Sequence, residues 1–301
     1  MAGSFTGVNL GELPPPNIVE PLSFESIFQG MLADLRARDT AFNALVESDP
    51  AYKLLEVAAY RELLIRQRVN EAARAVMVAY AVNADLDQLA ANFDVARLVI
   101  EDADPDAVPP KEAVMESDTD FRRRILLSME GHTTAGSIGS YIFHALSASG
   151  DCKDAAVASP VIAPGRVDIA ILSRTGNGAA PNATLDAVHA ALNAEEVRPL
   201  CDTVRVQSAT IIAYSIQAVL TVFPGAGQDR VLAAANAAAQ AYTAKQHALG
   251  LDVTRSGVFA ALHVAGVQNV NLISPGADVA VRWNEAPHCT SVALSVGGED
   301  E

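Results

Sequence analysis

The stretch from Asp49 to Ala81 reads DPAYKLLEVAAYRELLIRQRVNEAARAVMVAYA and predicts one long helix. Asp49 can cap its first turn, and Pro50 suits the first helical position, where no backbone N–H is needed. No proline occurs from 51 to 104 and no glycine from 31 to 130, so nothing in the sequence interrupts this helix. At 1.5 Å per residue it would be about 45 Å long.

The apolar residues of this helix recur on more than one side. Glu62 and Arg66 lie one turn apart at the edge of the apolar stripe and can form an ion pair. A helix that is apolar on several sides needs several neighbours, so two interpretations remain open: a core helix within one domain, or a helix shared with another chain. The residues that we expect at a shared interface are Leu55, Val57, Ala58, Tyr60, Leu64, Ile65, Val69, Ala72, Val76 and Tyr80.

The chain is acidic and rich in hydrophobic residues. It has 301 residues, of which 21 are basic and 36 acidic, giving a formal net charge of -15. This charge opposes phosphate backbones and anionic lipids, so we expect neither nucleic acid nor a membrane as a partner. No stretch approaches ~20 uncharged apolar residues, and 1–22 lacks the pattern of a signal peptide.

The rest of the sequence predicts an α+β protein with an elongated helical N-terminal region followed by two small antiparallel sheet-plus-helix modules. We expect an extended proline-rich arm at 1–22, a helical region at 23–100 and an exposed linker at 101–116. The first α+β module is expected at 117–209, and the second, with an acidic C-terminal tip, at 210–301.

Individual elements follow from caps, turns and periodicity. In the helical region, Ser23 predicts a helix to about Arg38, and Asp85 predicts a short one at 86–92. Further helices are predicted at 118–130, 137–149, 181–192, 229–249 and 256–264, and strands at 155–159, 167–172, 202–207, 211–222, 267–273 and 291–296.

Each candidate site for chemistry has a stronger structural explanation, so no catalytic residue, cofactor or metal is expected. Gly131 and Gly136 have the spacing of a phosphate loop, but the lysine is absent and a turn between helices explains them. The histidines lack metal-ligand spacing, and the basic run from Arg122 to Arg124 lacks interleaved aromatic residues. Cys152, Cys201 and Cys289 are odd in number and far apart, which favours reduced, buried thiols over a disulfide framework.

Several segments carry a family pattern. They are ESDP at 47–50, AYREL at 59–63, RQRVNEAARAVM at 66–77, DLD at 85–87, VMESDTDFR at 114–122, AGS at 135–137, VRP at 197–199 and ALHV at 261–264. With these segments the chain resembles the baseplate assembly protein J family of contractile-tailed phages and R-type pyocins. The resemblance covers nearly the whole chain and is most specific from Glu47 to Arg122.

The resemblance implies a structural protein of the virion tail baseplate, or of a pyocin particle, made in the host cytoplasm. Two copies would combine with one tail protein I-like partner into a wedge, with the N-terminal helices bundled. Six wedges would form a ring around the central hub, next to a hub-proximal lysozyme-like or sheath-initiating baseplate protein. The ring would couple attachment to sheath contraction. A tail-associated hydrolase and a stand-alone homodimeric scaffold remain the alternatives.

Overall fold

The computed structural model describes residue 14 and residues 16–133, 136–225 and 227–300, and the chain forms two compact units that divide between Ala96 and Arg97. Most of the predicted proline-rich arm, residues 1–13 and 15, lies outside the described part. No described helix is long and apolar enough to cross a membrane. The α+β class is confirmed, because an all-helical unit precedes two sheets with helices packed on them.

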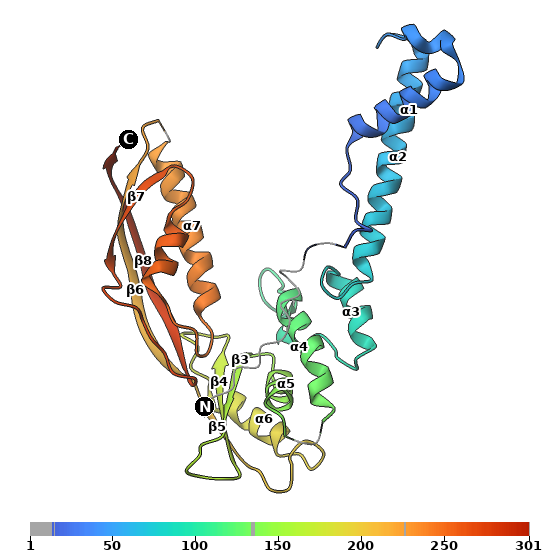
Figure 1. Ribbon diagram of the computed structural model, residues 1–301. Helices are drawn as coiled ribbons and strands as arrows, with labels where there is room; N and C mark the ends of the chain where they lie inside the picture. The colour runs from blue at the N-terminus through green and yellow to red at the C-terminus, as the bar shows by residue number, and fades with distance from the viewer. Residues whose placement is uncertain (1–13, 15, 134–135, 226, 301) are drawn as a thin grey trace. The chain divides into compact units, whose positions relative to one another are not determined.

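The N-terminal unit consists of helices (Figure 1). The first, α1 (Phe24–Arg38), is capped by Ser23, whose hydroxyl accepts from the Ser26 amide at 3.3 Å. A short 3-10 turn, η2 (Thr40–Ala44), then leads to α2 (Pro50–Ala75) and α3 (Asn83–Ala91). The predicted long helix is therefore real, with Pro50 in its first turn.

The long helix ends earlier than the sequence predicts. It spans 26 residues, and Val76 is its C-terminal cap. The chain then turns so that the Ala81 amide bonds to the Met77 carbonyl and the Ala81 side chain is buried. Asp49 precedes the helix, but its carboxylate accepts from the Val46 amide and not from the helix itself. Helix α2 ends at Ala75 because the turn that follows it is buried. Local periodicity carries no information about this tertiary contact.

Part of the predicted linker is ordered into a small ribbon. Strands β1 (Val99–Glu101) and β2 (Val114–Met115) pair antiparallel, and Asp104 pairs with Lys111 farther along the same loop. Since β2 leads directly into the cap of the next helix, the ribbon is continuous with the module that follows.

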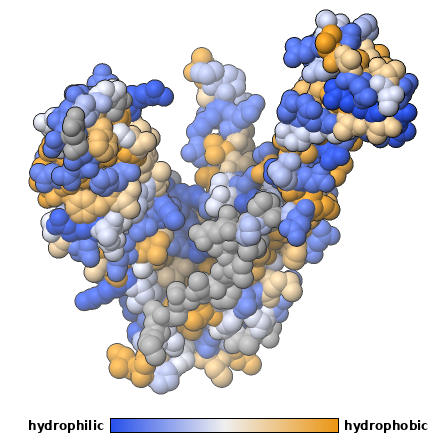
Figure 2. Space-filling view, turned by 45° about the horizontal axis from the view of Figure 1, so that its top comes forward, coloured by the Kyte–Doolittle hydropathy of each residue, from blue (hydrophilic) through white to orange (hydrophobic). Residues whose placement is uncertain are grey.

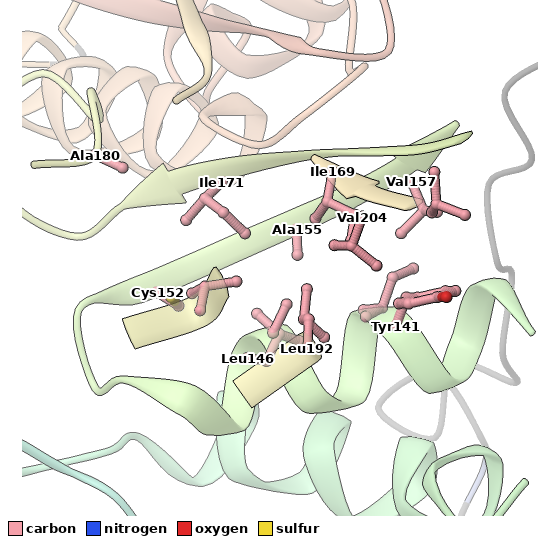
Figure 3. Packing of buried hydrophobic residues seen from close by; sticks show 14 of the residues in the cluster. Tyr141, Leu146, Cys152, Ala155, Val157, Ile169, Ile171, Ala180, Leu192 and Val204 are labelled. Atoms are coloured by element: carbon pink, nitrogen blue, oxygen red, sulfur yellow. The ribbon is translucent and has the colours of Figure 1, made fainter. Parts of the chain in front are cut away.

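The first α+β module packs helices on a three-stranded sheet. Its helices are α4 (Asp118–Gly131), α5 (Ile138–Ala148) and α6 (Asn182–Leu192), and its strands are β3 (Cys152–Ala158), β4 (Arg166–Ser173) and β5 (Thr203–Ser208). Figure 3 shows Tyr141 and Leu146 of α5 facing Ile169 and Val204 of the sheet. Ser117 and Ser137 cap α4 and α5, because their side chains accept from the Asp120 and Ser140 amides, respectively.

The second module has the same kinds of element in a different order. It contains β6 (Thr210–Val222), α7 (Gln228–Gln246), α8 (Arg255–Leu262), β7 (Val267–Ser274) and β8 (Glu285–Glu299). The strand order is β7-β6-β8, and Figure 1 shows the helices on one face of the sheet. The predicted acidic tip belongs largely to β8, which continues to Glu299.

Neither sheet is purely antiparallel, which differs from the sequence prediction. β4 pairs parallel with β5, and β6 pairs parallel with β8, whereas the remaining pairs are antiparallel. The cause is topological: α6 connects β4 to β5, and α7, α8 and β7 intervene between β6 and β8. The helix α6 returns the chain to the starting end of the first sheet, so β5 runs parallel to β4. In the second sheet β7 runs opposite to β6, and β8 then runs back in the direction of β6.

The basic run at the start of α4 is divided between interior and surface. Arg124 donates from Nε and Nη2 to the Glu116 carboxylate at 2.9 and 2.6 Å, and both side chains are at most 4% exposed. Arg123 pairs with Asp154 of β3 at 2.8 Å. Leu126 has the helical spacing of a core residue but is 41% exposed, while Phe121 and Ile125 are buried. Arg124 thus takes an interior position and attaches β2 to α4.

Arg124→Ala should destabilise this unit strongly, because it leaves the Glu116 carboxylate buried without its cation. We expect a loss of about 3–5 kcal/mol in the free energy of unfolding, measured by urea denaturation of the full chain. Arg38→Ala, which breaks an exposed ion pair with Asp34, should cost no more than about 1 kcal/mol. A double variant, Glu116→Gln with Arg124→Met, should be more stable than Arg124→Ala alone. Equal losses for the two single variants would contradict this account.

Candidate assembly surface

One face of α2 is covered by α1. Phe28 and Leu32 of α1 and Ala59 of α2 are buried together, with Tyr52 and Leu55 packed at the edge of the cluster. The rings of Phe28 and Tyr52 lie 4.8 Å apart between centroids. Ala59 and Asn70 are the buried residues of α2. A single short helix thus covers one side of the N-terminal half of α2 and leaves the other sides to solvent.

The uncovered side of α2 is apolar along most of its length. Val57, Ile65 and Val69 are 60%, 65% and 55% exposed, respectively. They recur at spacings of eight and four residues and so share one stripe. Arg61 lies four residues from both Val57 and Ile65 and interrupts this row. A group of exposed large apolar side chains on one helix is a candidate interaction surface, whereas single exposed ones are ordinary. We call this row, from Leu54 to Val76, the α2 stripe.

The structure places the predicted interface residues in three environments. Tyr60 and Leu64 are exposed beside the stripe. Leu55 is half-buried against α1, and Tyr80 lies half-buried in the turn after α2. Leu54 was not among the predicted interface residues, yet it is 71% exposed and precedes Val57 by three residues, a spacing that could have identified it. The predicted residues on the exposed α2 stripe itself are Val57, Ala58, Ile65, Val69, Ala72 and Val76.

A groove opens at the C-terminal end of the α2 stripe. It has a volume of about 630 Å³ and lies between the last turns of α2 and the start of α3. Val76, Tyr80 and Val82 contribute its apolar lining, and Arg68 and Asp85 are among the charged residues around it. A partner side chain inserted here would meet apolar surface within a charged rim, as at the centre of protein interfaces.

The charges on α2 are mostly paired along the helix. Arg66 pairs with Glu62, as the sequence predicts, and also with Glu20 of the preceding arm. Lys53 pairs with Glu56, and the pKa of Lys53 is raised chiefly by this hydrogen bond. Exposed pairs of this kind add little stability. With five basic and three acidic residues, α2 keeps a formal charge of +2 beside the apolar stripe.

The end of the arm is fixed to α2 by one amide side chain. The Glu20 amide donates to Oδ1 of Asn70 at 3.1 Å, and Nδ2 of Asn70 donates to the Glu20 carbonyl at 2.8 Å. Asn70 is only 9% exposed, so the two bonds are shielded from water. No sequence signal distinguishes Asn70 from the other polar residues of the helix. The two hydrogen bonds of Asn70 fix the end of the arm, at Glu20, against α2.

The residues considered for chemistry do not converge into a reaction centre. Within the described ranges, no three His, Cys, Asp or Glu side chains are grouped to hold a metal ion. Gly131 packs against the Phe143 ring, where a Cβ would lie 2.3 Å from Cδ1, so close packing of α4 on α5 explains this glycine. Burial raises the pKa of the Cys152 thiol to about 12, which makes it a poor nucleophile. Cys201 is exposed, contrary to prediction, and Cys289 is intermediate.

Three family patterns match consecutive parts of the chain. The baseplate J-like N-terminal domain matches 47–104, the central domain 133–208 and the C-terminal domain 214–295. Baseplate protein J of Escherichia phage P2 is 47% identical over 301 residues, covering 98% of this chain and 99% of that protein. The chain belongs to the baseplate J-like family.

The domain matches of this baseplate J-like chain correspond to the structural parts. The N-terminal match contains α2 and the whole α2 stripe, and the other two cover the cores of the two α+β modules. The resemblance inferred from the sequence is thereby confirmed. Figure 2 shows apolar residues at the surface, mixed with hydrophilic ones, in this baseplate J-like protein.

Asn70→Ala should release the arm without unfolding α2. The substitution removes both hydrogen bonds to Glu20, and such bonds contribute about 1–3 kcal/mol when their loss leaves buried groups unpaired. We expect faster hydrogen exchange at the Glu20 amide, measured by mass spectrometry, with unchanged exchange in α4. Gln67→Ala, an exposed change on the same helix, is the control. Unchanged protection at Glu20 would show that other contacts hold the arm.

Proposed function

We propose that this chain is a structural wedge protein of a contractile-tail baseplate, and that the α2 stripe is its joint with other subunits. The observation that carries the proposal is the exposed apolar row on α2, from Leu54 to Val76, which lies within the match to the baseplate J-like N-terminal domain. The similarity to baseplate protein J of phage P2 over nearly the full length of both chains supports the baseplate assignment.

The apolar row is large enough to drive association. Burying one large apolar side chain contributes about 1.5–3 kcal/mol. Leu54, Val57, Ile65, Val69 and Val76 are all more than half exposed. Burying several of them can offset the entropic cost of association, which is about 4–15 kcal/mol. The helix is already held by α1, so little further ordering is required.

The proposed partners follow from the family resemblance and fit the helical surface. Two copies and one tail protein I-like subunit would form a wedge by bundling helices against the α2 stripe. Six wedges would close around the hub, next to a lysozyme-like or sheath-initiating protein, and transmit attachment to the sheath. Because a 2:1 complex is not symmetric, the stripe would occupy two different environments in one wedge.

Val69→Asp should block wedge formation. The carboxylate would lie in the middle of the stripe and would have to be desolvated when a partner helix covers it, which is costly without a cation. Co-expression with the neighbouring tail protein, followed by size-exclusion chromatography, should show a loss of the mixed complex of at least about tenfold. Gln67→Asp adds a negative charge to the same helix two residues away, off the stripe, and should retain the complex.

Wild-type yield of the complex with Val69→Asp would exclude the stripe as the joint. Native mass spectrometry of the wild-type complex should give a mass of two copies plus one partner, and a 1:1 complex alone would reject the asymmetric wedge. The two alternative functions make different predictions for the chain expressed without a partner. A homodimeric scaffold would form a stable dimer by itself, and a hydrolase would show turnover of cell-wall substrates.

A further inference from the structure

The two α+β modules meet at a small junction that the end of α7 completes. A cluster of buried side chains joins elements of both modules: Leu172, Ala209 and Ala286, with Ile211 and Leu249 packed against them. The Leu249 amide, which follows α7, donates to Oδ2 of Asp154 on β3 at 3.0 Å. Two of the three buried residues are alanines, so little apolar area holds this junction and its polar contacts matter more.

His247, the residue that follows α7, contacts both modules. On its own module, its Nδ1 lies 2.7 Å from the Pro287 carbonyl of β8, and because a carbonyl only accepts, Nδ1 carries the proton. On the first module, the loop after β4 lies against the same ring, so close that a Cβ at Gly178 would come within 2.9 Å of Nε2. The Gly178 carbonyl accepts from the Ser173 amide at 2.8 Å, which fixes this loop to β4. The imidazole therefore fills the space between β8 and the β4 loop.

The surroundings of His247 favour a neutral ring. Burial is the largest cause that lowers the pKa of His247 below its ordinary value of 6.5, and the positive charges of Lys153 on β3 and of His288 on β8 act in the same direction. The hydrogen bond to Pro287 acts against them. The rings of His247 and His288 lie 5.3 Å apart between centroids. A proton added at Nε2 would place a cation beside these groups and against the Gly178 backbone.

The carboxylates at the junction have other partners. Asp154 of β3 accepts from Arg123 of α4 at 2.8 Å and from the Leu249 amide. Glu285, at the start of β8, accepts from the Arg282 amide at 2.7 Å. Lys245, the last basic residue of α7 itself, adds a further positive charge to this end of the helix.

The direct connection between the modules is one residue long. Strand β5 ends at Ser208 and β6 begins at Thr210. The Ala209 amide donates to the Ile171 carbonyl of the first module, whereas the Thr210 amide donates to the Asn284 carbonyl of the second. The backbone therefore passes from one module to the other at Ala209, which is the position of a hinge.

We propose that His247 is an acid-sensitive latch: its neutral ring holds the two modules in one orientation, and its protonation frees them to rotate about Ala209. The opened junction exposes the ring to water and so binds a proton more readily than the closed one. Closure is therefore at full strength above pH 6.5, the ordinary pKa of histidine, and weakens as the pH falls toward the lowered pKa of His247. The latch uses none of the residues of the α2 stripe, so its test and the test of the wedge joint can fail separately.

Hydrogen exchange at the Leu249 amide tests the latch in the full chain. After correction for the intrinsic exchange rate at each pH, the opening constant should rise about tenfold between pH 7 and pH 5.5. His247→Asn keeps an N–H donor at the position of Nδ1 but cannot take up a proton, so its opening constant should not change over this range. His189→Asn removes an exposed histidine of α6 and should respond to pH as the wild type does.

Three outcomes would overturn the latch. The first is a wild-type opening constant that does not change with pH. The second is a pH response that survives His247→Asn and is lost in His288→Asn, because the sensor would then be His288. The third is an equal loss of protection in α4, because the whole unit would then unfold and the junction would not open by itself.

Distances between spin labels test the rotation. In a full chain with Cys289→Ser, one label is attached to the exposed Cys201 of the first module and the other to Gln240→Cys on α7. The distance distribution from pulsed electron paramagnetic resonance should be broader at pH 5.5 than at pH 7, and His247→Asn should abolish the difference. Labels on Cys201 and Asn182→Cys, both in the first module, should give the same distribution at both pH values. An unchanged distribution between the modules would show that they do not rotate and would overturn the inference.

Discussion

The N-terminal unit depends on one packing constraint: α2 is longer than the segments of its own unit that pack against it. Helix α1 covers the face that carries Ala59, and the arm reaches Asn70, but neither covers the row from Leu54 to Val76. A helix of 26 residues is about 39 Å long. Of the residues before α2, those that the structure describes form one helix and one short turn, and much of the apolar surface of α2 remains exposed.

The second unit contains several small elements, and buried polar contacts hold them together. Glu116 and Arg124 are both nearly fully buried and tie β2 to α4, and Glu116 also accepts from the Leu98 amide at 3.2 Å. Asp154 accepts from Arg123 and from the Leu249 amide, which joins the first module to the end of α7. These polar contacts fix directions between elements whose apolar cores are separate.

Local sequence signals predicted most of the elements and the existence of the candidate surface. Ser23 accepts a hydrogen bond at the start of the helix that it was expected to cap. Prediction failed where a distant contact decides the outcome. Leu126 has the helical spacing of a core residue, but Arg124 takes an inner position because Glu116 is there to pair with it.

The sequence by itself determined the helical and strand segments, the family and the excess of apolar residues on α2, because caps, periodicity and residue patterns act over a few neighbours. Only the tertiary structure decided which side of α2 is covered, where α2 ends and which histidine lies between the two modules. Leu55 and Ile65 look equivalent in the sequence, yet one packs against α1 and the other faces solvent. The physical reason is that the burial of a side chain depends on which distant segment packs against it, and periodicity contains no information about that segment.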